Sequence, residues 1–184
     1  MSTKEITHEM YKVFSNYHQA NNELIDKWQE LILYTPRWWL GLFLGFIPWF
    51  IWWRFHHKDH TGDLLRAGFF MGLVSLFLDS IGVQRGLWIY SFDVFPFIPG
   101  YIPWDLTLLP ITMMIMIEFK QKWHPLWKGI MYAGFSSFIG EPLAVYIKLY
   151  EPLHWKSYYS FPIYVLLFVI CHKIAKGKVF NSRL

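Results

Sequence analysis

Charged residues are scarce in this chain: Asp, Glu, Lys and Arg make up 16% of its 184 residues, against about 25% in typical soluble domains. The single cysteine, Cys171, excludes an intrachain disulfide and a thiolate zinc cluster. No P-loop, dinucleotide fingerprint, nucleophile elbow or HExxH motif occurs. We therefore expect no cofactor.

Apolar residues are abundant instead: 54% of the chain is hydrophobic and 21% is aromatic. The few charges are segregated and leave long, nearly uncharged stretches between them. Stretches of this length are typical of helices that cross a bilayer. The sequence therefore predicts an all-α, polytopic transmembrane helix bundle with about five spans, at residues 38–53, 63–81, 101–117, 129–147 and 158–171.

The distribution of Lys and Arg predicts the orientation of these spans in a cell membrane. If residues 54–66, 118–128 and 172–184 are cytoplasmic, they hold ten Lys/Arg and three acids, and the other side holds seven Lys/Arg and ten acids. Cytoplasmic loops carry the Lys/Arg excess. We therefore expect an outside N-terminus and a cytoplasmic C-terminus, and the net charge of +4 needs no nucleic-acid partner.

Residues 1–36 form a separate, amphipathic N-terminal region, followed by a transmembrane helical domain at 37–184. Apolar residues recur there at steps of three and four with charges between them, which predicts a helix. Such a helix lies on the membrane, folds against the bundle or binds a partner. Pro36 separates it from the first span.

Three carboxylates fall inside otherwise apolar spans. Asp79 shares one helical face of the second span with a row of small residues: Gly68, Gly72, Ser75, Gly82 and Gly86. Asp105 lies near the start of the third span. Glu141 lies in the fourth span on the stripe Ala133, Ser137, Glu141 and Ala144. Because a charge in lipid needs a partner, water or a task, we expect these three acids to meet in one cavity in the outer half of the bundle.

A structural explanation of the acids stays open. Asp79 and Glu141 could pair with Arg85 or Lys148, and Asp105 could cap the start of the third span. Likewise, the cluster His56, His57, Asp59 and His60 is better explained as a polar loop than as a metal site.

The segment between the second and third spans is rich in aromatic residues and prolines. It could fold back as an apolar lid over a lipid-like ligand, or remain an ordinary interfacial loop. Candidate substrate-binding residues are Trp88, Tyr90 and Trp104, with Ser75 beside Asp79 and Ser137 beside Glu141. Most of the tryptophans lie near span ends, where an aromatic belt is expected.

Two family resemblances appear on these residues. Asp79, Gly86-x-Trp88-x-Tyr90, Pro103-x-Asp105 and Glu141 resemble the order of motifs in membrane-embedded lycopene cyclases. That resemblance implies acid-initiated cyclisation of an isoprenoid, with Asp79 and Asp105 as acids, although Leu106 stands where the family has a second Glu. The chain also resembles an uncharacterised family of small polytopic membrane proteins of endospore-forming bacteria, in three segments: residues 88–90, 99–105 and 159–164.

The sequence thus supports three kinds of function. The first is an enzyme in which Asp79, Asp105 and Glu141 protonate an isoprenoid-like lipid. The second is non-enzymatic binding or transport of an ion, a proton or a lipid, and the third is a structural membrane component. The expected partner is a membrane lipid or isoprenoid-like ligand, and a homo-oligomer is also possible.

Overall fold

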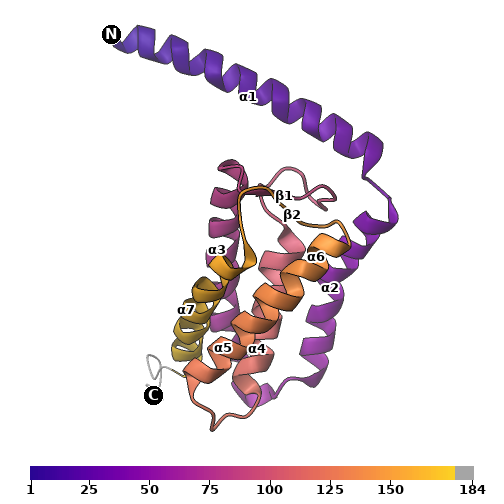
Figure 1. Cartoon of the computed structure of the whole chain (residues 1–184), viewed down its shortest axis with the longest axis vertical. Coiled ribbons are helices and arrows are strands. Elements are labelled where there is room, and N and C mark those ends of the chain that lie inside the picture. Colours follow the sequence, from indigo (N-terminus) through magenta and orange to yellow (C-terminus); the bar gives the residue numbers. More distant parts are fainter. Residues whose placement is uncertain (177–184) are drawn as a thin grey trace.

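The computed structural model describes residues 1–176, and within that range the fold is all-α (Figure 1). The predicted cytoplasmic tail, 172–184, therefore lies partly outside the described residues. Beyond the N-terminal helix α1 (Thr3–Leu31), five long helical segments run alternately down and up the molecule. Their elements are α2 (Pro36–Phe55), η1 with α3 (Lys58–His60, Thr61–Gln84), η2 with α4 (Trp104–Leu108, Leu109–Glu118), α5 with η3 and α6 (Pro125–Phe135, Ser136–Gly140, Glu141–Tyr146), and α7 (Ser157–Lys176).

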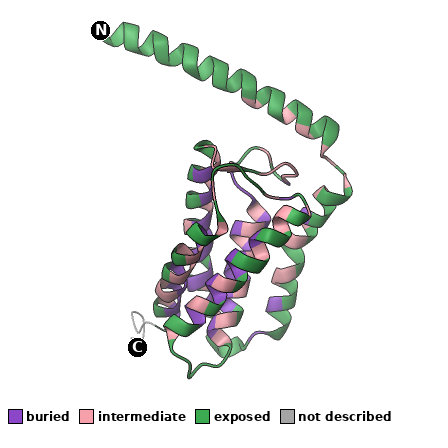
Figure 2. Ribbon diagram, in the orientation of Figure 1, coloured by how far each residue is buried: buried purple, intermediate pink, exposed green. Residues whose placement is uncertain are grey.

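These segments pack into one bundle around α3. Helix α3 contacts η2, α4 and α7, while α5 packs along α7 and α2 lies against η2 and α4. The core is apolar, with Met71, Met113, Met114 and Phe168 fully buried between the helices. Figure 2 shows the buried positions gathered on the inward faces of the bundle.

Among the described residues, two helices are long and apolar enough to cross a membrane: Lys58–Gln84 and Ser157–Lys176. The predicted third and fourth spans are each divided by a π-helical turn, so that α4 has 10 residues and α5 has 11. Helix α2 has 20 residues but is rich in tryptophan, whose indole N–H lowers its hydropathy.

Helix α1 forms as predicted and ends before Pro36. Its start is fixed by a capping box, in which Ser2 Oγ accepts the Glu5 N–H and the Glu5 carboxylate accepts the Ser2 N–H. None of its residues is buried, and it extends away from the bundle, crosswise to the other helices (Figures 1 and 2). It touches the bundle through Trp28, whose indole N–H donates to the Asp93 carbonyl at 2.8 Å.

Two connecting loops close one end of the bundle. Helix α3 ends at Gln84, and Gly86 adopts a left-handed φ of +66°, which lets the chain turn back because glycine lacks a Cβ. The sequence predicted that Gly86 continues the small-residue face of α3, but Gly86 lies beyond the end of the helix. The strand β1 (Trp88–Ile89) then pairs antiparallel with β2 (Glu151–Pro152) and joins the two loops.

Each π-helical turn precedes a proline. Pro110 has no N–H to offer the Leu106 carbonyl, which instead accepts the indole N–H of Trp49 at 3.2 Å. Pro142 likewise follows η3 (Ser136–Gly140). The N–H groups of Leu109 and Glu141 bond back five residues, to Trp104 and Ser136, which is the π-helical pattern often found at functional sites.

Candidate functional site

The small residues of α3 allow close approach of the neighbouring segments. A Cβ on Gly68 would lie 2.8 Å from the Met114 sulfur, and one on Gly72 would lie 3.1 Å from a Leu106 methyl group. Gly68, Gly72, Ser75, Asp79 and Gly82 are all buried, so the helical face that the sequence predicted is the packing face. Asp79 is thereby held against η2, which carries Asp105.

A cavity of about 650 Å³ lies at the end of the bundle closed by the two loops. Its wall consists mainly of aliphatic and aromatic side chains from α2, α3, η2, α4, η3, α6, α7 and both loops. Asp79, Asp105 and Glu141 all line it, and each is at most 6% exposed. All three sequence-predicted acids therefore face one cavity.

Asp79 is fully engaged by donors from the folded-back loop. Trp88 Nε1–H and Tyr90 O–H donate to its Oδ1 at 2.6 and 2.8 Å, and the Tyr101 N–H donates to its Oδ2 at 2.8 Å. Burial and the adjacent Asp79 charge raise the pKa of Tyr90 well above its ordinary value, so its hydroxyl remains a donor. Three donors on one carboxyl group suit its ionised form.

Asp105 lies beside Asp79. A Cβ on Gly100 would be 2.8 Å from Asp79 Oδ2 and 3.4 Å from Asp105 Oδ2, so both carboxyl groups crowd the same point. Gly100 has φ +132°, and its missing side chain keeps that point free. Asp105 Oδ2 is buried and has no hydrogen-bond partner. The predicted alternative, a helix cap, does not occur, because the start of η2 has no side-chain cap.

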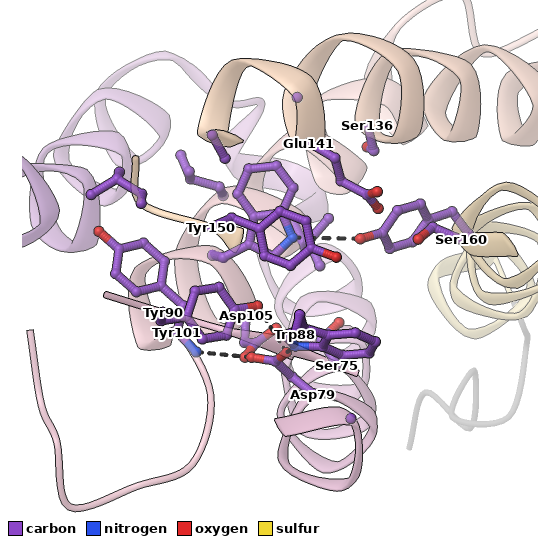
Figure 3. A pocket seen from close by; sticks show the side chains of 18 of the residues that line it. Ser75, Asp79, Trp88, Tyr90, Tyr101, Asp105, Ser136, Glu141, Tyr150 and Ser160 are labelled. Carbon is purple, nitrogen blue, oxygen red and sulfur yellow. Dashed lines mark hydrogen bonds between the residues drawn. The ribbon is translucent and has the colours of Figure 1, made fainter. Parts of the chain in front are cut away.

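Glu141 lies on the opposite wall of the cavity, near Ser136 and Ser160, with the Tyr150 ring between it and the two aspartates (Figure 3). Its Oε2 is buried and has no hydrogen-bond partner. The three acids thus share a cavity without forming one cluster: Asp79 and Asp105 come together, and Glu141 faces them.

The predicted stripe Ala133, Ser137, Glu141 and Ala144 assumed a regular α-helix, but a π-helical turn lies at Ser136–Gly140. In the π-helical turn, residues five apart share a face, and the Glu141 N–H bonds to the Ser136 carbonyl. Ser136 therefore lines the cavity with Glu141, whereas Ser137 is fully buried away from it.

Among the residues that the structure describes, the three acids have no basic partner. Arg85 and Lys148, the partners considered above, are exposed. Within residues 1–176 the ion pairs are Lys12–Glu9, Lys27–Glu30 and Arg66–Asp63, and none of them involves a cavity acid. The proposed ion pairing is therefore not what stabilises Asp79 or Glu141 here.

The predicted substrate-binding residues Trp88, Tyr90, Trp104 and Ser75 all line the cavity. Sequence reasoning missed Tyr150, Trp155 and Tyr164, which line it as well. Trp155 packs edge-on against Trp88 with ring centroids 5.1 Å apart. The pairing of β1 with β2 brings Tyr150 and Trp155 to the loop that carries Trp88, and two-residue strands leave little signal in a sequence. Tyr164 lies on α7.

The tryptophans divide between the interior and the surface. Trp52 is buried and stacks on His56 with ring centroids 4.0 Å apart, while Trp88, Trp104 and Trp155 face the cavity. An aromatic belt therefore does not account for these four. His56 also bonds to the Thr61 hydroxyl at 2.6 Å, as a loop residue packed at a helix end would.

No family model, curated protein or solved structure matches this chain. The geometry of the cavity is therefore the basis for a functional proposal.

Proposed function

We propose that this chain is a multi-pass membrane protein in which α2, α3, η2–α4, α5–α6 and α7 each cross the bilayer. Two of these helices meet the length and hydropathy required of a span. Large apolar side chains are also exposed outside the cavity, including Phe43, Phe46, Phe50, Phe69, Phe77, Phe138 and Leu166. Soluble monomers rarely expose so much contiguous apolar surface, whereas lipid tails would cover it.

Within this membrane protein, the cavity is proposed to bind an isoprenoid-like lipid and to protonate it. The observation that carries this proposal is the Asp79–Asp105 pair, buried at one side of a mostly apolar, aromatic-lined cavity without a basic partner. Two adjacent carboxyl groups in a dry site do not both ionise. The donors on Asp79 favour its carboxylate form, so Asp105, with its unpartnered Oδ2, would carry the proton.

The reaction conserves atoms and charge. The π electrons of a terminal double bond take the proton from Asp105, which leaves a carboxylate and a tertiary carbocation on the lipid. A second double bond of the same molecule attacks the cation and closes a ring through a new C–C bond. Loss of a proton from a neighbouring carbon to the carboxylate pair restores Asp105, and the product is an isomer of the substrate. Trp104, Tyr150 and Tyr164 present π faces that stabilise the cation, while the apolar wall keeps water from quenching it.

The test is conversion of acyclic isoprenoids by membranes that contain the full chain. Membranes with the wild-type protein or Asp105→Asn are incubated with lycopene, squalene and geranylgeraniol, and the products are separated by chromatography and weighed by mass spectrometry. We expect a product of unchanged mass and shifted retention for at least one substrate, absent with Asp105→Asn. Unchanged substrates in the presence of correctly inserted wild-type protein would contradict acid-initiated cyclisation.

A second candidate, lipid binding without turnover, is favoured by Leu106, which stands where the cyclases have a further acid. In that case native mass spectrometry of the purified protein would find a lipid retained in the cavity with its chemical structure unaltered.

A further inference from the structure

The charge of the cavity wall is one-sided. Asp79, Asp105 and Glu141 line it, and no Lys, Arg or His from the described residues 1–176 does so. Intramembrane acids usually pair with bases or with polar groups of neighbouring helices. Here Asp79 is satisfied by three donors, but Asp105 and Glu141 are not.

Two carboxyl oxygens on opposite sides of the cavity are buried and lack a donor: Asp105 Oδ2 and Glu141 Oε2. A neutral occupant such as an isoprenoid supplies neither oxygen with a donor, and an anion would be repelled by the carboxylate that the Asp79–Asp105 pair keeps when Asp105 holds a proton. A cation interacts favourably with both through its charge alone, with no need for a directed hydrogen bond. The unpartnered oxygens therefore favour a positively charged occupant.

The shape of the cavity indicates a large organic cation and not a metal ion. Among residues 1–176, no three His, Cys, Asp or Glu side chains lie close enough together to hold a metal, because the aspartates and Glu141 occupy different walls. The space between them is about 650 Å³, within the roughly 300–1,000 Å³ of small-molecule sites. Trp104, Tyr150 and Tyr164 contribute π faces there, which attract bulky, weakly hydrated cations.

We infer that this cavity binds lipophilic organic monocations, of the quaternary phosphonium and ammonium class, between Asp105 and Glu141. The inference goes beyond the proposed cyclisation, since binding needs neither a double bond nor proton transfer. An isoprenoid cation formed during a reaction and a permanent lipophilic cation would be stabilised by the same groups.

The first test uses the wild-type protein alone. The full chain in lipid nanodiscs is titrated with tetraphenylphosphonium and, as a neutral control of similar aromatic size, with triphenylphosphine oxide, and uptake by empty nanodiscs is subtracted. We expect saturable binding of the phosphonium at least about tenfold tighter than that of the oxide. Equal affinities, or no saturable phosphonium binding, would overturn the inference without any mutation.

The second test uses three variants of acids. Glu141→Gln and the double variant Asp79→Asn/Asp105→Asn, which removes the negative charge that the aspartate pair keeps, should each weaken phosphonium binding about tenfold or more and leave oxide binding unchanged. Glu151→Gln is the matched control, because Glu151 is an exposed acid on β2 that does not line the cavity, and it should bind as the wild type does. Wild-type affinity in both cavity variants would also overturn the inference. Phosphonium binding and isoprenoid turnover are separate readouts, so failure of either proposal is distinguishable from failure of the other.

Discussion

Trp88 donates its indole N–H to Asp79 at 2.6 Å, and it reaches that position because Gly82 has no side chain. A Cβ on Gly82 would lie 2.0 Å from the Trp88 ring, far inside van der Waals contact. Gly82, one helical turn beyond Asp79, thus leaves the space in which Trp88 packs and donates to the Asp79 carboxylate. This relationship connects the small-residue face of α3 with the chemistry of the cavity.

Gly82→Ala is therefore predicted to displace Trp88 and to lower stability. Overpacking a closed contact typically costs about 1–3 kcal/mol, and the lost bond to Asp79 adds to that cost. Thermal unfolding of the detergent-solubilised protein would measure it as a lower Tm. The intensity of tryptophan fluorescence should also change, because Trp88 leaves its contact with Asp79.

Gly62→Ala is the matched control in the same helix, because nothing lies within 4 Å of a Cβ at Gly62. Alanine is the better helix former by about 1 kcal/mol, so this variant should be neutral or slightly more stable. If both variants behaved alike, the contact of Trp88 with Gly82 would not be what positions the loop.

The position of Asp93, in the loop between β1 and η2 where α1 contacts the bundle, leads us to expect that stability depends on pH. Burial, the largest cause, raises the pKa of Asp93 to about 7 against two opposing backbone hydrogen bonds. The folded protein therefore holds a proton on Asp93 that the unfolded chain has lost above about pH 4. This contribution to stability is complete below about pH 4 and is lost as the pH rises toward 7 and above.

The consequence is a fall in Tm between about pH 4 and pH 7 that Asp93→Asn should diminish, because the amide is neutral throughout. The backbone carbonyl of Asp93 accepts the Trp28 indole N–H. The protection of amides from hydrogen exchange at the C-terminal end of α1, corrected for the intrinsic effect of pH, should therefore also fall over this interval in the wild type. An identical pH profile in Asp93→Asn would assign the dependence to another group.

The sequence predicted helical faces correctly where the helix is regular. In α3 the spacing of small residues identified the buried face from Gly68 to Gly82, because no proline interrupts it. In the fourth segment the same reasoning placed Ser137 in the site. Pro142 and the π-helical turn before it shift the face by one residue to Ser136, and such a turn is not readable from periodicity.

The cavity itself was only half predictable. The aromatic residues of the loop after α3 indicated a candidate lid, and Trp88 and Tyr90 do fold back onto Asp79. Tyr150 and Trp155 arrive through the β1–β2 pairing, which joins residues more than sixty positions apart. Long-range pairing of two-residue strands depends on the packed bundle, so local sequence patterns do not reveal it.

The proposed topology predicts that residues on opposite ends of the bundle label differently in intact cells. With Cys171, which is buried, replaced by alanine, single cysteines are placed at Ser2 and at Gln121. A membrane-impermeant maleimide should modify Ser2→Cys in intact cells and Gln121→Cys only after lysis. Modification of both in intact cells would mean that the number or the direction of the spans is wrong.

The amide variants of two cavity acids separate stability from function. Glu141→Gln should leave Tm near that of the wild type, because Glu141 Oε2 has no partner to lose. Asp79→Asn should stay folded but lose about 1–3 kcal/mol, because one acceptor oxygen becomes an NH₂ group that faces a donor, either the Tyr101 N–H or the pair from Trp88 and Tyr90. Both variants should lose isoprenoid turnover, since each removes a carboxyl group from the cavity.

The control for this last prediction is Glu151→Gln, an equally conservative change of an exposed acid, which should keep both Tm and turnover. If the cavity acids had only a structural role, a variant that stays folded would keep its isoprenoid turnover, and the variants would differ from the wild type in Tm alone. If neither Asp79→Asn nor Glu141→Gln yielded a monodisperse detergent-solubilised species, the acids would be needed for folding and their catalytic assignment would fail. Normal turnover in a folded Glu141→Gln protein, with Asp79→Asn inactive, would instead confine the chemistry to the Asp79–Asp105 pair and leave Glu141 to bind the ligand.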